Sequence, residues 1–269
     1  MIPRPIFDPR EFGKMRLVCM MSGSGTNVAK IVEYQRKLEE ELGRSPFEVV
    51  AIFTDNKQSN AKALAERYSL PCVCRDIMEF YRERGHETKK DLSIRPEYDG
   101  ATVDFLEKYQ PHAVALCGYM SIVTRPILDR FGDRIFNVHP ADLSLRDAAG
   151  RRRFVGTNAV RDAILAGAKQ LYSSTHIVRE EVDHGEILMR SRPVEVVLPF
   201  GMDLQALSRA ENRPVLEEVV RVHQERLKEQ GDWVIYPLTL RMVSEGRYAL
   251  DRDGNVYVDG QLMPFGYRL

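Results

Sequence analysis

Short apolar runs alternate with amphipathic stretches through the first half of the chain. The apolar runs cover residues 16–21, 47–54, 71–74, 112–117 and 135–139. Between them, the patterns at about 26–41, 59–68 and 100–109 are helical, and the charged stretch 76–95 indicates a helix followed by a loop. Runs that are apolar at every position are typical of strands buried on both faces. The pattern therefore predicts an α/β fold with a mostly parallel sheet and helices on both faces.

The second half of the chain has a different pattern. Two further strands are expected at 171–178 and 186–196, and a long, charge-rich helical stretch covers 203–230 with a break near Pro214. A helix is expected at 232–245, followed by a C-terminal hairpin at 247–258 around the turn dipeptide Asp253-Gly254. No internal repeat or linker interrupts the sequence. It predicts one domain over 1–269, with an N-terminal extension at 1–14 and a helical insertion at about 198–230.

Composition narrows the class of protein. The 269 residues are 43% hydrophobic and 29% charged, with 39 Lys+Arg against 39 Asp+Glu. This balance disfavours a nucleic-acid partner, which usually requires a basic excess. Residues 1–14 lack the apolar core of a secretory signal, and no apolar run has the length of a membrane span. We therefore expect a soluble cytoplasmic protein without a membrane partner.

The four cysteines agree with a reducing compartment. Cys19 and Cys117 lie in runs that predict buried strands, where cysteine behaves as a small apolar residue. Cys72 and Cys74 are too close together, and have too few neighbouring ligands, for a zinc site. The histidines His139, His176 and His184 also lack a plausible ligand set, so no metal is expected.

A glycine-containing loop, Ser22 to Asn27, follows the first strand and opens a helix. Unpaired backbone N–H groups at a helix N-terminus can hold a phosphate, and glycines let a ligand approach the backbone. The loop lacks the full spacing of a dinucleotide site and the Lys-Ser/Thr pair of a P-loop. A tight turn with Thr26 or Ser24 as the helix cap is an equally weighted alternative.

Two separate segments carry candidate catalytic groups. Asn137 and His139 are two apart at the end of a strand, so both point to the same face. An amide beside a histidine can stabilise an oxyanion and move a proton, although a histidine under a turn is the alternative. Asp183 precedes a glycine turn. It could orient a histidine and raise the pKa of that histidine, or it could only form hydrogen bonds within its own loop. Spacing alone does not connect Asp183 with His139.

The order of these segments resembles the glycinamide ribonucleotide formyltransferase family, folate-dependent enzymes of purine synthesis with a Rossmann-like fold. The resemblance extends from about residue 15 to 267. Its segments are M-S-G-S-G-T-N, L-C-G-Y-M-S-I-V, I-F-N-V-H-P, V-D-H-G-E-I-L, V-I-Y-P and D-G-Q-L-M-P-F-G-Y. The N-x-H-P with a downstream D-x-G belongs to the wider folate formyltransferase superfamily, and the C-terminal segment indicates this branch.

The resemblance implies a role for each matching position. The catalytic residues would be Asn137, His139 and Asp183, with His176 near the active site. Gly25, Thr26 and Asn27 would hold the substrate phosphate, and Asp232 would contact the ribose. The folate co-substrate would be bound by Met120, Ser121, Ile122, Val123, Arg95 and Asn137. The reaction implied is transfer of the formyl group of 10-formyltetrahydrofolate to an amine of a phosphate-bearing substrate, without a metal.

Departures from the family pattern lie on the substrate side. Ser121 stands where the family usually has Arg, and Asp232 stands where it has Glu. After Pro140 an added polar stretch, residues 146–153, would hold extra anionic groups or form a solvated loop. The insertion at 198–230 would form an interface, including that of a homodimer, or a surface helical hairpin. Formyl transfer is therefore better supported than the identity of the acceptor.

Several alternatives remain open. The chain could formylate another amine, such as a nucleotide-linked amino sugar, or bind folate or nucleotide as a regulator without turnover. A formyltetrahydrofolate hydrolase would carry an N-terminal regulatory domain, and only about fourteen residues precede the first strand here. A methionyl-tRNA formyltransferase would need an RNA-binding domain and a basic surface. A nicotinamide-dependent oxidoreductase would rest on the glycine loop alone.

Overall fold

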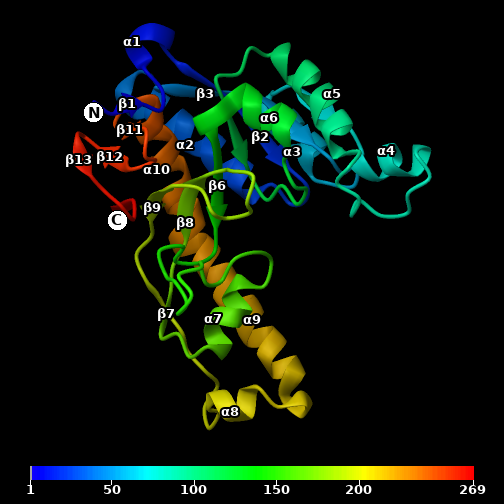
Figure 1. Ribbon diagram of the computed structural model, residues 1–269, viewed down its shortest axis with the longest axis vertical. Coiled ribbons are helices and arrows are strands. Elements are labelled where there is room, and N and C mark those ends of the chain that lie inside the picture. The colour runs from blue at the N-terminus through cyan, green and yellow to red at the C-terminus, as the bar shows by residue number, and fades with distance from the viewer. Residues whose placement is uncertain (1) are drawn as a thin grey trace.

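The structure, a computed structural model, describes residues 2–269 and has an eight-stranded sheet at its centre (Figure 1). The strand order is β14-β9-β8-β6-β5-β2-β3-β4. The strands are β2 Met15–Met21, β3 Phe47–Thr54, β4 Cys72–Cys74, β5 Ala113–Leu116, β6 Ile135–His139, β8 Ser174–Ile177, β9 Ile187–Arg190 and β14 Tyr267–Arg268. From β6 to β4 all neighbours are parallel, whereas β8 is antiparallel to both β6 and β9. The predicted mostly parallel sheet is confirmed.

Helices cover both faces of this sheet. Alternate residues of β2 point to opposite faces, so Leu17 and Cys19 join one hydrophobic cluster while Val18 and Met20 join another. The first cluster includes side chains of α2 Thr26–Leu42, α3 Ala61–Tyr68 and α10 Trp233–Ser244. The second includes side chains of α4 Ile77–Glu83, α5 Arg95–Glu107 and α6 Arg125–Phe131. Burial on both faces explains why the strands are apolar at every position.

Some helices differ from the sequence-based expectation. The helix expected from residue 100 begins at Arg95, because Pro96 is well suited to the first turn of a helix. Two short helices, α6 and α7 Ala159–Leu165, were not expected. The break near Pro214 is confirmed, since α9 Arg213–Leu227 begins there after α8 Leu204–Leu207 and the 3₁₀ turn Ala210–Asn212.

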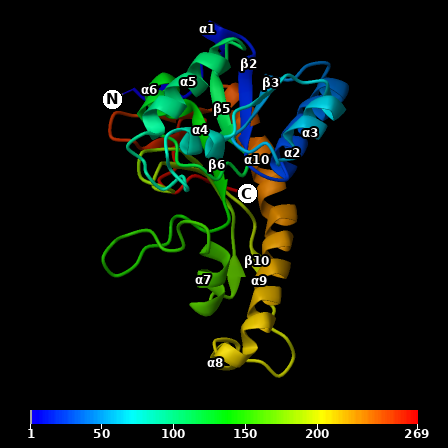
Figure 2. The same cartoon turned by 90° about the vertical axis from the view of Figure 1, so that its right-hand side faces the viewer.

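An arm formed by α7, α8 and α9 projects away from the sheet (Figures 1 and 2). It has its own apolar cluster, which includes Ile164, Leu207, Leu216 and Leu227. A two-stranded sheet of β7 Gln170–Leu171 and β10 Val194–Glu195 also lies on this side. A π-helical turn, Lys228–Asp232, connects α9 to α10. One nearly continuous helix, from α9 to α10, thus runs from the arm into the central body, beside the segments that lead to and from β7 and β10.

An N-terminal strand and three strands from the C-terminal region form a second, four-stranded sheet. Its order is β1 Arg4–Pro5, β11 Tyr248–Leu250, β12 Val256–Val258 and β13 Gln261–Leu262. The predicted hairpin around Asp253-Gly254 is confirmed by the β11–β12 pairing. The helix α1 Pro9–Phe12 and the 3₁₀ turn Gly132–Arg134 complete the fold. Within residues 2–269, no helix combines the length and apolar character that crossing a membrane requires.

Candidate active site

The carboxyl ends of the central strands bring the predicted functional segments to one edge of the sheet. The chain leaves β2 toward β3 on one side, and β5 lies on the other side of β2. Ser22 follows β2, Asp55 follows β3, Gly118 lies beyond β5, and His139 ends β6. The Ser22 backbone N–H donates to the Gly118 carbonyl over 3.1 Å. This edge, at the point where the strand order reverses, is where open α/β sheets bind ligands.

Asp183 lies between two histidines beside this edge. One carboxylate oxygen is 3.4 Å from His139 Nδ1, and the other is 3.5 Å from His176 Nε2. Asn137 is directly opposite His176 in the antiparallel β6–β8 pair, and its Nδ2 is 3.3 Å from His176 Nε2. The structure therefore brings together four side chains from two distant parts of the sequence: Asn137 and His139 from one, and His176 and Asp183 from the other.

The charges of this group depend on burial and on one another. Burial alone would raise the pKa of Asp183, but hydrogen bonding to His176, the nearby His139 and the Gly156 N–H lower it to about 2. Burial lowers the pKa of His139 below its usual value, and the attraction of Asp183 only partly opposes this. Asp183 does act to raise the pKa of His139, as expected from sequence, but in this conformation the burial of His139 outweighs that effect.

A hairpin in the added polar stretch causes that burial. Arg146 and Arg152 pair across it, and the turn is closed by the Gly150 N–H donating to the Asp147 carbonyl. Its returning arm brings the Phe154 carbonyl to 2.8 Å from His139 Nε2, leaving His139 only 5% exposed. Phe154 has φ of 49°, which is uncommon for a bulky residue. A substrate can reach His139 Nε2 only after this carbonyl has moved.

The arginines of this hairpin are mostly engaged within the protein. Arg146 donates to the Gly150 carbonyl, and Arg151 pairs with Asp147. Arg152 donates to two carbonyls of the Asp183 turn. The Arg153 guanidinium lies 4.6 Å from the centre of the Phe154 ring. Of the two interpretations made from sequence, an anion site is disfavoured because three guanidinium groups already have acceptors.

The glycine loop has the geometry of a helix terminus open to a ligand. Gly25 is the N-cap of α2 with φ of 70°, and no side chain caps the helix. The alternative with Ser24 or Thr26 as the cap is therefore wrong. Asn27 Oδ1 is buried without a hydrogen-bond partner among residues 2–269. The uncapped backbone N–H groups at the positive end of this 17-residue helix suit an anionic ligand, whereas Asn27 Oδ1 can only accept a hydrogen bond from a donor.

Asp232 is buried at the π-helical turn between α9 and α10. The Ser173 hydroxyl donates to its carboxylate, and Ser173 immediately precedes the strand that carries His176. Burial raises the pKa of Asp232 to about 6, although Ser173 and Lys228 act in the opposite direction. Single π-turns within helices often occur at functional sites.

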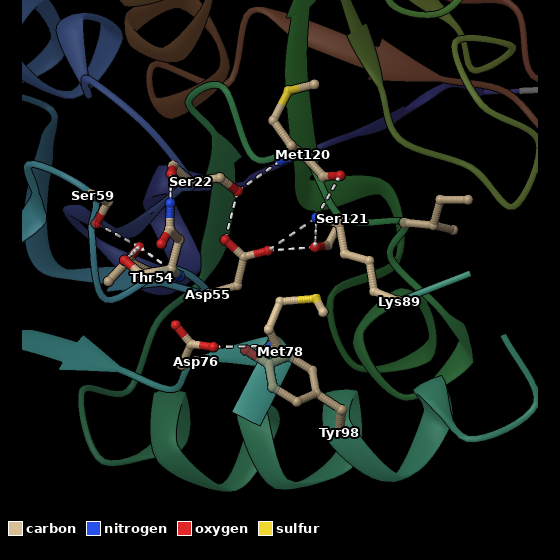
Figure 3. Close-up of polar contacts among 12 residues, drawn as sticks. Ser22, Thr54, Asp55, Ser59, Asp76, Met78, Lys89, Tyr98, Met120 and Ser121 are labelled. Atoms are coloured by element: carbon tan, nitrogen blue, oxygen red, sulfur yellow. Dashed lines mark hydrogen bonds and ion pairs between the residues drawn. The ribbon is translucent and has the colours of Figure 1, made fainter. Parts of the chain in front are cut away.

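Another buried carboxylate, Asp55, connects two ligand loops predicted from sequence (Figure 3). It is 1% exposed and accepts hydrogen bonds from Ser22, over 2.6 Å, and from Ser121. Ser22 Oγ in turn accepts from the Met120 N–H over 2.8 Å. Asp55 therefore holds the start of the glycine loop against the start of the predicted folate loop.

Lys89 supplies a positive charge to this carboxylate from a separate loop. Its Nζ lies 4.0 Å from Asp55 Oδ2 and donates to Ser121 Oγ and the Met120 carbonyl over 3.0 and 3.2 Å (Figure 3). Sequence reasoning found neither Asp55 nor Lys89. The available signal was a carboxylate directly after a buried strand, at the edge where Ser22 was already a candidate.

Arg95 lies beneath the predicted folate loop. It is 1% exposed, and its guanidinium donates to the carbonyls of Ile122 and Lys89, each over 3.2 Å. The contact of Arg95 with folate stays a prediction. In the loop above it, Met120 and Ile122 are partly exposed, whereas Ser121 and Val123 are buried.

Metal ligands do not gather in the described part of the chain. Across residues 2–269, no group of three or more His, Cys, Asp or Glu side chains has an arrangement that could hold a metal ion.

Comparisons with known proteins agree with this geometry. The sequence pattern of the family described as "Formyl transferase" matches residues 15–209. Phosphoribosylglycinamide formyltransferase of Haemophilus influenzae is 27% identical over 93% of this chain and 96% of its own length. The trifunctional purine biosynthetic protein adenosine-3 of Gallus gallus is 25% identical over 91% of this chain, which corresponds to 20% of that longer protein. The crystal structure of glycinamide ribonucleotide transformylase 1 from Symbiobacterium toebii superposes with a TM-score of 0.63 and 27% identity, covering 91% of this chain and 94% of that one.

Proposed function

Since the chain belongs to the formyl transferase family, we propose that it transfers the formyl group of 10-formyltetrahydrofolate to the amine of glycinamide ribonucleotide, in de novo purine synthesis. The observation that carries the proposal is the contact group of Asn137, His139, His176 and Asp183 at the ligand-binding edge of the sheet. The similarity to phosphoribosylglycinamide formyltransferase along nearly the whole chain supports this acceptor over other amines.

The chemistry follows from what these side chains can donate. The uncharged amine attacks the formyl carbon, and the carbonyl oxygen becomes an oxyanion. Asn137 Nδ2 and the Nε2 proton of His139 would stabilise that oxyanion, each contributing about 3–4 kcal/mol. The bond from the formyl carbon to the folate nitrogen then breaks, and the proton lost by the amine is returned to the folate nitrogen, which leaves as tetrahydrofolate.

Asp183 would set the orientation and charge of His139 during this step. Its carboxylate faces Nδ1, so Nε2 is the nitrogen directed toward the reacting group. Movement of the Phe154 carbonyl would free Nε2 and reduce the burial that now lowers the His139 pKa, while removing the smaller, opposing effect of the Phe154 hydrogen bond. The attraction of Asp183 would then favour the protonated imidazole that oxyanion stabilisation requires.

The remaining site residues would bind the two substrates. Gly25, Thr26 and Asn27 would hold the phosphate at the open N-terminus of α2, and Asp232 would contact the ribose. Met120, Ser121, Ile122 and Val123 would line the folate site. We assign Arg95 a supporting role beneath that loop, because its guanidinium holds the Ile122 carbonyl and is buried.

The direct test mixes the purified protein with 10-formyltetrahydrofolate and glycinamide ribonucleotide, and follows the folate product by absorbance. We expect steady turnover that requires the acceptor. His139→Ala and Asp183→Asn should each reduce kcat by at least about 100-fold, with circular dichroism unchanged. His184→Ala is the matched control, because its side chain lies toward Glu181 and the Val182 carbonyl rather than toward Asp183.

The outcomes separate the alternative functions. Near-normal turnover of Asp183→Asn would refute the catalytic assignment. Folate binding without turnover on glycinamide ribonucleotide would redirect the search to other amines, starting with nucleotide-linked amino sugars. Binding without turnover on any amine would identify a regulator, and product formation without an acceptor would identify a hydrolase.

A further inference from the structure

The returning arm of the hairpin contacts the catalytic group at every second residue. Arg152 donates to the Asp183 turn, the Phe154 carbonyl meets His139, and the Gly156 N–H donates to Asp183 Oδ2 over 2.8 Å. One of these contacts is made by a side chain and two by backbone groups, and Phe154 and Gly156, with φ of 49° and 76°, bend the arm toward the site. This stretch, which sequence reasoning treated as an anion site or a solvated loop, is packed against the reaction centre.

Of these contacts, that of Arg152 is bidentate: its guanidinium donates to two carbonyls of the Asp183 turn, and we call this pair of hydrogen bonds the Arg152 clamp. Its Nη1 donates to the Asp183 carbonyl over 2.5 Å, and its Nη2 donates to the Gly185 carbonyl over 2.8 Å. The guanidinium is a planar fork, so it can meet two carbonyls simultaneously, whereas the single ammonium of lysine is a point donor. The turn that carries the catalytic carboxylate is thus fixed at both ends of the Asp183–Gly185 segment.

This turn needs external support. Asp183 has φ of 57°, in the left-handed region that costs a non-glycine residue about 1–3 kcal/mol. The neighbouring Glu181 and Val182 are exposed, so they give the turn little packing. A turn held in an unfavourable conformation persists only where its surroundings determine it, and here two of its carbonyls are held by one side chain.

We infer that Arg152 is a positioning residue that fixes the Asp183 turn, and through it the contact between Asp183 and His139. The expected change in kcat rests on the proposed formyl transfer, whereas the two hydrogen bonds of Arg152 to the turn do not depend on it. Arg152 touches only main-chain carbonyls of this turn, so its loss should alter the rate of the chemical step more than folate binding.

The experiment compares Arg152→Ala with Arg151→Ala in the full-length protein. Arg151 is the matched control because its guanidinium, 78% exposed, pairs with Asp147 away from the turn. Hydrogen–deuterium exchange should increase in the segment 181–186 for Arg152→Ala and stay at the wild-type level for Arg151→Ala. The kcat of Arg152→Ala should fall by about 10- to 100-fold, since small displacements of a catalytic group have effects of this size. The KM for the folate should change little.

Two further measurements separate positioning from general damage to the fold. Millimolar guanidinium should partly restore the kcat of Arg152→Ala, whereas equal sodium chloride should not, because only guanidinium can occupy the vacant fork. Arg152→Lys should be intermediate, and it replaces Arg152→Ala in the comparison if the alanine variant does not fold.

The outcomes are decisive in both directions. Unchanged exchange at 181–186 would overturn the clamp, and increased exchange with wild-type kcat would overturn its role in positioning. If the wild-type protein does not formylate glycinamide ribonucleotide, the proposed acceptor fails instead. Amide exchange then decides the Arg152 clamp independently of any substrate.

Discussion

At the scale of single residues, the site contains groups whose placement costs the fold stability. Asp232 is the clearest case, because a carboxylate at a buried π-turn has only Ser173 as a hydrogen-bond donor from a side chain. Its pKa of about 6 lies above the ordinary 3.8, so ionisation of this carboxyl at neutral pH is less favourable in the folded than in the unfolded chain. A residue retained at such a cost is a strong candidate for binding a ligand.

Asp232→Asn should therefore stabilise the protein at neutral pH. Because the pKa is raised, Asp232 contributes most to the free energy of unfolding below pH 3.8, where it is neutral in both states. This stabilising contribution is lost as the pH rises through about 6. The shift corresponds to at most about 3 kcal/mol. Asparagine stays neutral, so the variant should gain about 1–3 kcal/mol over wild type in urea unfolding at pH 8 and little at pH 4. A variant that is less stable at pH 8 would contradict the buried-charge argument.

The residue-scale predictions from sequence depended on motifs. Asn137, His139, His176 and Asp183 could be named because the resemblance fixed their positions, and the structure brings them into contact. Spacing alone could not join Asp183 to His139, since the two approach each other only through the β6–β8 pairing and the turn before β9. The positioning role of Arg152 was missed because its partners are main-chain carbonyls of a distant turn, and Asp55 was missed because its position after a buried strand was the only local signal, its partners being hydroxyls of distant loops.

At the scale of elements, Asp55 connects three loops, and Lys89 is the residue that balances its charge. Lys89→Ala should leave the buried carboxylate without this cation and reduce the free energy of unfolding. The pair is separated by 4.0 Å and Lys89 is 36% exposed, so we expect a loss of about 1–3 kcal/mol, less than for a fully buried pair.

A second substitution makes this prediction specific. Ser121 Oγ already contacts Asp55, so Ser121→Arg would place a guanidinium near the same carboxylate. Lys89 also holds the Met120 carbonyl of the predicted folate loop, so Lys89→Ala should raise the KM for the folate. In that background, Ser121→Arg should recover part of the lost stability and lower this KM. Urea unfolding and steady-state kinetics of the two single variants and the double variant test this. A double variant worse than Lys89→Ala would show that Lys89 does not act by charge.

Elements were predictable where apolar runs were long and uninterrupted. The strands from β2 to β6 and the helices α2, α3 and α10 follow directly from the hydrophobic pattern. The seven-residue helices α6 and α7 were missed, because two turns give too short a window for helical periodicity. The sequence pattern did not predict the hairpin at 146–153, because this hairpin is held by hydrogen bonds to the Asp183 turn rather than by an apolar face.

At the scale of the whole molecule, the two clusters of the central body are separate from the cluster in the arm. The helical insertion expected at 198–230 is helical and forms much of that arm. A single domain, a cytoplasmic location and a homodimer formed through this insertion stay predictions. Analytical ultracentrifugation of the wild-type protein addresses the last of these directly.

The separate arm cluster leads to a prediction about how the molecule unfolds. Leu207 is fully buried there, in the short helix α8, and Leu17 is fully buried in β2. Leucine-to-alanine changes at such sites cost about 2–5 kcal/mol. If the arm opens while the sheet stays folded, Leu207→Ala should accelerate hydrogen–deuterium exchange in 198–227 and leave the slowest amides of β2 and β3 unchanged.

Leu17→Ala is the matched comparison, because it removes the same group from the central sheet. We expect it to accelerate exchange of the β2 and β3 amides, and the arm should follow, since the arm loses its attachment through α10 when the body unfolds. If Leu207→Ala instead accelerates the β2 and β3 amides as strongly as Leu17→Ala does, the arm and the sheet unfold as one cooperative unit. That result would support the single domain predicted from sequence, and it would mean that the π-helical turn at 228–232 transmits stability between arm and body.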